Sequence, residues 1–346
     1  MTRTPDPSWI EARLVGARPR VLGALLRWFR DLDLAERLDA ADYRDNILRL
    51  LFVCCHPELP ATQQIALALR IVSGLPVKRI AAAFLVSEAA MEQRITRAKA
   101  RIARADIPFE TPGPTERAER IAAVAAMIYL VFNEGYTDAH PSSERASLCT
   151  EAIRLARLVL RMFPAEPELL GLLALMLLQH SRHRARFDVE GDVILLEDQD
   201  RSCWDRRMIG EALALLGKAM PHHRPGPYQI QAAIGALHAR AARPEDTDRA
   251  GIERLYQALE SRTPSPVVTL NRAVAVLKQH GPLAALEIVE PLAAALDGYF
   301  YFHGLRGTLL RELGRVSEAR EAFGRAIALA NTAAEAMHIR RQLDQL

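Results

Sequence analysis

Apolar residues recur at helical spacing along almost the whole of this chain, and no other feature restricts its fold as strongly. Between residues 42 and 55, for example, the apolar side chains fall on one side of a helix with about 3.6 residues per turn; they are Ile47, Leu48, Leu51 and Phe52. No segment has the alternating pattern of a half-buried strand. Proline and glycine interrupt the helical pattern at intervals. The sequence therefore predicts an all-α fold.

The composition is that of a globular protein whose charge is nearly balanced. The 346 residues are enough for two or three domains, and 50% of them are hydrophobic while 25% are charged. The formal net charge is only +3. Any affinity for nucleic acid must therefore come from a local basic surface rather than from the chain as a whole.

The cysteines predict neither a disulfide framework nor a metal site. They are Cys54, Cys55, Cys149 and Cys203, a set that is typical of a reducing compartment. Cys54, Cys55 and His56 are consecutive, but adjacent cysteines are poorly placed to bind one ion, and no CxxC pair accompanies them. We expect both cysteines to be buried as small apolar side chains.

Nothing in the sequence predicts insertion into a membrane. The first residues, MTRTPDPSW, lack the apolar core of a signal peptide. The longest apolar runs, Ile121–Phe132 and Leu169–Leu178, are shorter than the ~20 residues that span a bilayer. We expect these runs to form buried helices of a cytoplasmic protein.

The stretch from Leu75 to Arg104 has the pattern of a helix-turn-helix. Val77–Phe84 predicts a short helix, and the connection Phe84–Val86 leads to a second one. Ser87 is placed to cap the second helix, because its hydroxyl can accept a hydrogen bond from a free backbone N–H of the first turn. In DNA-binding proteins the second helix of such a pair enters the major groove. Leu85 stands where such turns often carry glycine.

The second helix is predicted to carry a basic stripe beside an apolar one. At ~100° per residue, four arginines fall within an arc of about 80°; they are Arg94, Arg97, Arg101 and Arg104. A neighbouring arc holds Met91, Ile95, Ala98 and Ile102. One side can therefore pack on a core while the other faces a polyanion, since arginine can bind phosphate or the edge of guanine. The alternative is a solvated basic face on an ordinary helix.

Acidic side chains gather between residues 187 and 205, which the helical pattern does not cover. They are Asp192, Glu197, Asp198, Asp200 and Asp205. Clustered carboxylates can bind a divalent cation, but between helices they more often cap helix ends or face solvent. We expect the second arrangement.

No motif of catalysis or cofactor binding is present. The chain has no glycine-rich phosphate loop, GxSxG elbow or HExxH pair. Glu134 is a candidate general acid, but no partner accompanies it and a structural role suits it better. Gly135 is predicted to end its helix in a left-handed cap. We therefore predict no enzymatic activity, no catalytic residue, no cofactor and no metal.

The C-terminal third contains an internal repeat. Residues 271–292 align with residues 305–327 at an offset of about 33 to 34 residues, with Gly281 and Gly314 at corresponding turns. This offset is the tetratricopeptide period, and stacked helix pairs of that kind form concave surfaces that bind a protein partner. The alternative is a helical platform that only stabilises the preceding domain.

Several motifs together resemble one family. LPATQQIALALRIVSGLPVKRIAAAFLVSEAAMEQRITRAKARI resembles region 4 of bacterial sigma factors of the extracytoplasmic-function class. LLFVCCHPELP, YLVFNEGY, LLEDQDRSCWD, RPGPYQIQAAIGALHA and SPVVTLNRAVAV are similar to the subgroup with a C-terminal tetratricopeptide-like extension. The resemblance covers roughly residues 45 to 346.

The resemblance implies a role in transcription initiation. Sigma factors join the core of RNA polymerase, and their region 4 binds the −35 element of promoter DNA in the major groove. The DNA-facing positions of the family fall on Ser87, Ala90, Glu92, Gln93, Arg94, Arg97 and Lys99. From chemistry, Gln93 and Arg94 suit base edges, Arg97 and Arg101 suit phosphates, and Lys99 suits only a backbone contact.

The N-terminal part departs from the family pattern. RPRVLGALLRWFRDLDLAER resembles the start of sigma region 2, yet the residues leading into region 4 follow at once. We expect a region 2 remnant at 1–40, region 4 at 41–107, a linker at 108–115 and a helical domain at 116–346 with repeats near 265–330. Most of region 2 has no counterpart in this sequence. We therefore find no segment for the aromatic and basic residues with which region 2 opens the −10 element.

Three hypotheses follow. The first is a sigma-type initiation factor whose C-terminal repeats regulate it or bind the polymerase core. The second is a regulator that binds DNA or polymerase without initiating transcription. The third is a helical-repeat interaction protein whose helix-turn-helix no longer binds DNA.

Overall fold

The computed structural model describes residues 50–346 except 57–58, 85, 105–113, 137–145, 189–190, 192 and 331–332. Every regular element among the described residues is helical, and one isolated bridge joins Phe187 to Val193. The predicted all-α fold is therefore confirmed. The expected region 2 remnant at 1–40, residue 85 of the turn and most of the linker at 108–115 lie outside the described residues. The chain divides into two compact units, Met1–Met162 and Phe163–Leu346.

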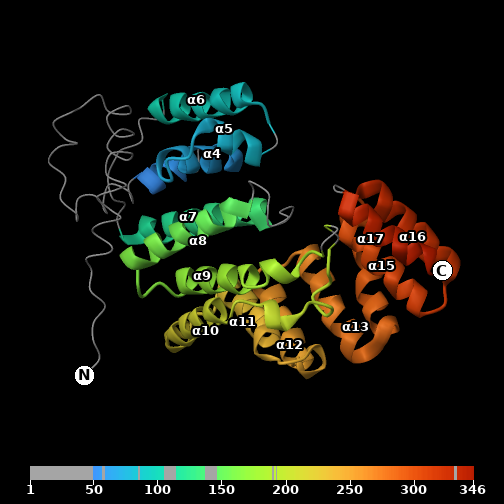
Figure 1. Ribbon diagram of the computed structural model, residues 1–346. Coiled ribbons are helices and arrows are strands. Elements are labelled where there is room, and N and C mark those ends of the chain that lie inside the picture. The colour runs from blue at the N-terminus through green and yellow to red at the C-terminus, as the bar shows by residue number, and fades with distance from the viewer. Residues whose placement is uncertain are drawn as a thin grey trace, which may run out of the picture. The chain divides into compact units, whose positions relative to one another are not determined.

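In the described residues of the first unit, five helices follow a helical segment at residues 50–54. They are α4 (Ala61–Ile71), α5 (Val77–Ala83), α6 (Glu88–Arg104), α7 (Pro114–Tyr136) and α8 (Ala146–Met162). α4 packs against α5, α6 and α7, while α7 and α8 pair along their lengths (Figure 1). Whether the expected linker at 108–115 separates two domains stays a prediction.

Gly135 does not end α7, which corrects the sequence prediction. The helix continues to Tyr136, and Gly135 is buried within it. Tyr136 stacks on Phe132 with ring centroids 5.5 Å apart. Residues four apart meet only while the helix continues, so this aromatic pair stabilises the last turn past the glycine.

One helix of the second unit, α9 (Pro167–His180), is apolar on all sides. The longer helices of this unit are α9, α10 (Arg206–Ala219), α11 (Pro227–Arg240), α12 (Arg249–Arg262), α13 (Pro266–Val289), α15 (Phe300–Glu312), α16 (Val316–Leu329) and α17 (Ala333–Asp344), with the short α14 (Ala293–Leu296) between α13 and α15. The residues Leu169–Leu178 of α9 are all buried. Both α10 and α11 pack along α9, so the run Leu169–Leu178 is a core helix, as predicted.

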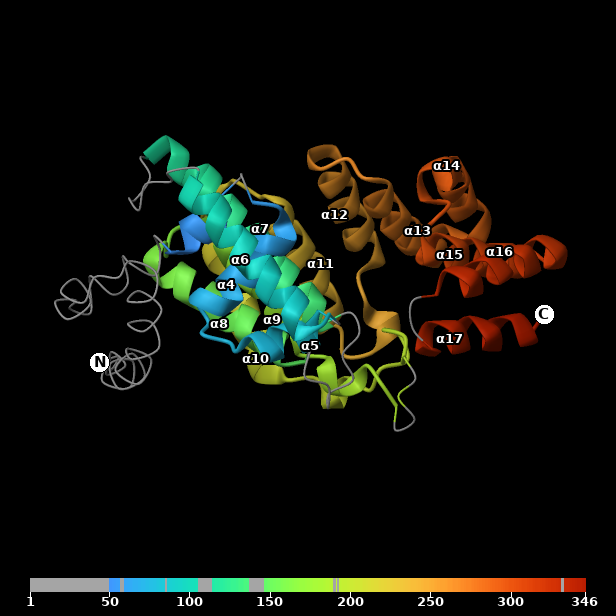
Figure 2. The same cartoon turned by 90° about the horizontal axis from the view of Figure 1, so that it is seen from above.

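The C-terminal helices pack against one another in chain order. α13 is two helices in one, because Gly281 has φ 84° and ψ 176° inside it. Gly314, with φ 73°, turns the chain between α15 and α16, as the sequence predicted. Positive φ is easily adopted only by glycine. The helices α15, α16 and α17 follow one another as neighbours (Figure 2).

Close packing of α15 against α16 depends on a second glycine. A Cβ at Gly307 of α15 would lie 2.5 Å from the ring of Phe323 in α16. Phe323 is fully buried in the core of this region. The small residue therefore lets the two helices approach each other.

The acidic segment contributes helix caps, as expected. Asp200 accepts a hydrogen bond from Ser202 N at 2.8 Å, and Asp205 accepts from Arg207 N and Met208 N at 2.9 and 3.0 Å. Asp205 thereby begins α10. No group of three or more metal-ligating side chains occurs among the residues that the structure describes.

Candidate nucleic-acid interface

The helices α5 and α6 form the predicted pair, and Ser87 begins the second helix. Its Oγ accepts a hydrogen bond from Ala90 N at 3.2 Å, and its carbonyl accepts from Met91 N at 3.0 Å. The connection is tight, because Val86 N donates to Ala81 O at 3.1 Å. The cap predicted from the sequence is confirmed.

One arc of α6 is fixed in the core of the first unit. The four apolar residues predicted for it are at most 5% exposed; they are Met91, Ile95, Ala98 and Ile102. They pack where α6 contacts α4 and α5, and Ile80 of α5 is also fully buried. The rotation of α6 about its axis is therefore set by packing.

The opposite side of α6 is open to solvent. Among the eight predicted DNA-facing residues, six are exposed and two, Arg94 and Lys99, are half-buried; the exposed ones are Ser87, Ala90, Glu92, Gln93, Arg97 and Arg101. Arg104 is also exposed. The structure thus places all eight on the accessible part of the helix or at its edge.

The arginines of α6 keep their hydrogen-bond donors available. In the described part of the chain, no carboxylate forms an ion pair with Arg94, Arg97 or Arg101. The two acidic residues of the helix, Glu88 and Glu92, lie in its N-terminal part, where negative charge favours the helix dipole. The C-terminal two thirds of the exposed side are therefore basic.

Polar contacts stabilise the start of α5. Arg70 of α4 donates from Nη1 to the carbonyl of Leu75 at 3.1 Å. Arg79 of α5 donates from Nη2 to the hydroxyl of Ser147 in α8 at 2.9 Å. These bonds connect the start of α5 to α4 and to α8.

Replacing Ser87 by alanine is expected to lower the free energy of unfolding of the first unit by about 1 kcal/mol, because the N–H of Ala90 loses its acceptor. Urea titration followed by circular dichroism measures this change. Thr96→Ala is the matched control, since Thr96 is exposed within the same helix and alanine favours helix. Equal stability of Ser87→Ala and the wild type would contradict the role of the cap.

The consecutive cysteines are buried, as predicted, and their thiols are protonated. Burial raises the pKa of Cys55 to about 12, although Arg120 opposes the shift, and burial also raises the pKa of Cys54. Metal binding and nucleophilic attack require the thiolate. Both residues therefore contribute to packing.

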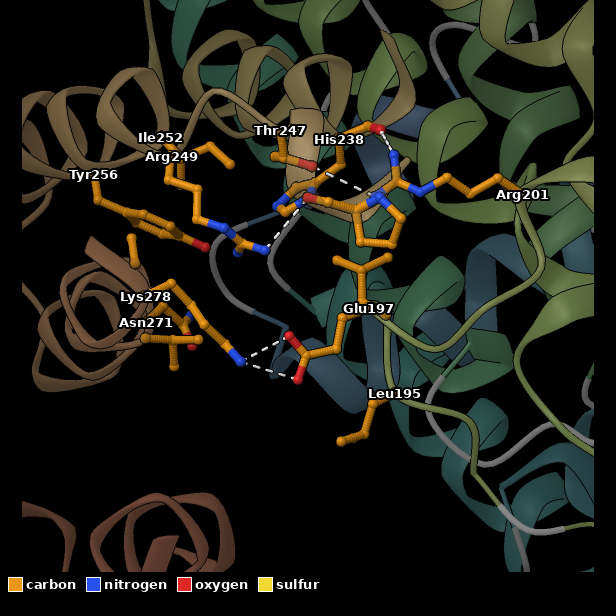
Figure 3. Close-up of a pocket in the computed structure, with 14 residues that line it drawn as sticks. Leu195, Glu197, Arg201, His238, Thr247, Arg249, Ile252, Tyr256, Asn271 and Lys278 are labelled. Carbon is orange, nitrogen blue, oxygen red and sulfur yellow. Dashed lines mark hydrogen bonds and ion pairs between the residues drawn. The ribbon is translucent and has the colours of Figure 1, made fainter. Parts of the chain in front are cut away.

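The structure also reveals a cavity that the sequence did not predict. It lies in the second unit, has a volume of about 330 Å³, and is lined by residues of α11, α12, α13 and the segment 195–201 (Figure 3). Its charged lining residues are Glu197, Arg201, Arg249 and Lys278. They are separated by up to 81 positions, so no spacing in the sequence could bring them together.

Two regions of the chain match known protein families. Residues 49–102 match the family of sigma-70 region 4. Residues 120–220 match a family of unknown function, DUF6596. An uncharacterized protein of Rhizobium meliloti (strain 1021) is 60% identical over 408 positions, which cover 99% of this chain and 96% of that protein.

The alignment with the Rhizobium meliloti protein is longer than this chain. It spans 408 positions whereas the chain has 346 residues, a difference of 62. Because 99% of the chain lies inside the alignment, at least 62 of its positions are gaps in this chain. The relative therefore contains internal sequence that has no counterpart here.

Proposed function

This chain belongs to the same family as the Rhizobium meliloti protein and carries a sigma-70 region 4, and on that premise we propose that it recognises a promoter −35 element and associates with RNA polymerase. The observation that carries the proposal is the fixed rotation of α6, whose buried arc leaves the predicted DNA-facing residues accessible. A capped basic helix after a tight turn suits entry into a major groove.

Each of the eight predicted DNA-facing residues has a role in this proposal. Gln93 and Arg94 contact base edges, where glutamine suits adenine and arginine suits guanine. Arg97 and Arg101 bind phosphates and set the position of the helix on the duplex. Three further residues, Ser87, Ala90 and Glu92, line the same surface, and Lys99 contributes a backbone contact. The function is recognition and involves no catalysis, cofactor or metal.

The finer assignment is to the extracytoplasmic-function sigma factors with a C-terminal tetratricopeptide-like domain. Two features support it: the break of α13 into two helices at Gly281 together with the packing of α15 against α16, and the 33-residue offset between Gly281 and Gly314. The repeats act in regulation, through a protein partner or through the polymerase core. No helix among the described residues is long and apolar enough to cross a membrane.

A second candidate is a regulator that binds DNA or polymerase without initiating transcription. The gap of at least 62 positions against the relative favours it. We assign this gap to sigma region 2, because the residues at 1–40 resemble only the start of that region. A chain without region 2 would dock through region 4 and compete with intact sigma factors.

Binding to purified core RNA polymerase, followed by transcription from a supercoiled template, separates the two candidates. The proposed function predicts saturable capture of the chain by the core enzyme. Transcripts that depend on the chain identify an initiation factor, and capture without transcripts identifies the regulator. No capture under conditions where an intact sigma factor binds would contradict both.

A further inference from the structure

The cavity of the second unit has the size and lining of a small-molecule site. Its volume of about 330 Å³ lies in the range of ligand pockets, roughly 300–1,000 Å³. Apolar walls come from Leu195, Ile252 and Val274. Leu195 is 41% exposed and Val274 is 43% exposed, and a bound molecule would cover these large apolar side chains.

The charges around the cavity are unbalanced. Three cations, Arg201, Arg249 and Lys278, line it together with one carboxylate, Glu197, which leaves a net charge of +2. The pKa of His238, which also lines the cavity, is lowered to about 4 by burial and by neighbouring arginines, so this imidazole is neutral at pH 7. The cavity therefore favours an anion.

Arg201 is a fixed positive charge in the wall. It is 7% exposed, and its Nη1 donates to the carbonyls of His238 and Ala241, both at 2.7 Å. Its guanidinium lies 5.0 Å from the ring of Trp204. Among the described residues no carboxylate forms an ion pair with it, and its Nε has no hydrogen-bond partner. Glu245 and Asp246 attract Arg201 electrostatically without forming a direct ion pair with it. Burial of the guanidinium is unfavourable, and an anion in the cavity would offset that cost.

Arg249 is the cation best placed to contact a ligand. Its one hydrogen bond in the described structure is a long one, 3.4 Å from Nη2 to the carbonyl of Pro244, so its planar donor pair remains available for a bidentate contact. Figure 3 shows Arg249 and Lys278 pointing into the same space from α12 and α13. Lys278 pairs with Glu197 at 2.7 Å, which connects the segment carrying Leu195 to α13.

We propose that this cavity binds a small organic anion, a carboxylate or phosphate group attached to an apolar body. The anionic group pairs with Arg249 in the positive field of Arg201. The apolar body lies against Leu195, Ile252 and Val274. The site belongs to the C-terminal unit and stands independently of the proposed DNA recognition; if both hold, it gives that unit a chemical signal to respond to.

Calorimetric titration of the full chain tests the charge requirement. The probes are naphthylacetate, naphthyl phosphate and decanoate, and naphthylacetamide is the uncharged control of matched shape. We expect at least one anion to bind saturably, with one molecule per chain, and the amide to bind roughly tenfold or more weakly. Equal binding of naphthylacetate and its amide would contradict an anion site.

Variants of Arg249 test whether the anion binds in this cavity. Arg249→Met keeps the apolar stem and removes the charge. We expect this variant to bind the anion roughly tenfold to a hundredfold more weakly than the wild type. Arg249→Lys is expected to retain part of the affinity. Arg254→Met is the matched control, because Arg254 is exposed on the same helix and does not line the cavity. The proposal is overturned if none of the three anions binds, or if Arg249→Met and Arg254→Met bind them alike.

Discussion

Replacing both Arg94 and Arg97 by alanine is expected to weaken binding of duplex DNA by about 2–6 kcal/mol, because each arginine contact to a base or phosphate contributes roughly 1–3 kcal/mol. Arg97 is exposed and Arg94 half-buried, and neither belongs to the apolar arc of α6. The fold should therefore survive the change. Fluorescence anisotropy with labelled promoter DNA measures the affinity.

The salt dependence of DNA affinity distinguishes the proposed roles of Arg94 and Arg97. A phosphate contact releases counter-ions, so losing one lowers the slope of log affinity against log salt by about 1. We expect Arg97→Ala to lower this slope and to weaken all sequences alike. Arg94→Ala should instead relax the preference for one base. The measurement is best made at low salt, where phosphate contacts are strongest.

The control for net charge is the double variant Arg207→Ala with Arg254→Ala. Both residues are exposed in the second unit, so this variant loses the same charge away from α6. We expect it to bind DNA like the wild type. If this control weakened binding as much as the replacement of Arg94 and Arg97, the affinity would depend on total charge. In that case α6 would not be the recognition helix.

Replacing Gly171 by alanine is expected to destabilise the second unit by about 3 kcal/mol. A Cβ at Gly171 would lie 2.6 Å from the backbone nitrogen of Gln229 and 2.8 Å from its Cα. Backbone atoms cannot move aside as the end of a flexible side chain does, so α9 and α11 must separate and loosen the core. Urea denaturation of the full chain measures the loss.

The backbone of Gln229 is held in place by several bonds, which is why it cannot yield. Glu168 of α9 accepts hydrogen bonds from the backbone N–H groups of Tyr228 at 3.0 Å and of Gln229 at 3.3 Å, and from Nε2 of Gln229 at 2.8 Å. The carboxylate thereby satisfies free N–H groups at the start of α11. Gly171 and Glu168 together fix the approach of α9 to α11.

Gly210→Ala is the matched control for this prediction. Gly210 also lies inside a helix, α10, but a Cβ there would have no atom within 4 Å. Alanine at such a position is expected to stabilise the protein by about 0.5–1 kcal/mol through helix propensity. Similar effects of the two substitutions would show that helix propensity, not close packing, governs Gly171.

The sequence analysis predicted the features that depend on residues close together in the chain. The apolar arc of α6 follows from helical spacing, and the Ser87 cap follows from the chemistry of one side chain. The turn at Gly314 follows from its conformational freedom and from the repeat. Each of these features is decided within a few turns of helix, so one sequence is enough to find it.

The sequence analysis was wrong at one helix end and missed a cavity that distant parts of the chain build. Gly135 has the residue type of a cap, but the ring of Tyr136 packs on Phe132 and the helix continues. The cavity is built from Arg201, Arg249 and Lys278 on separate elements. Their common orientation depends on how α12 and α13 pack, which spacing along the chain does not encode.

The central claim is that α6 reads a specific DNA sequence, and in vitro selection from random duplexes tests it most directly. The full chain is used with and without core RNA polymerase, beside the double variant of Arg94 and Arg97. We predict that the wild type enriches one short motif that the variant does not. Recovery of unbiased sequence in both conditions, or of the same motif with the variant, would contradict the claim.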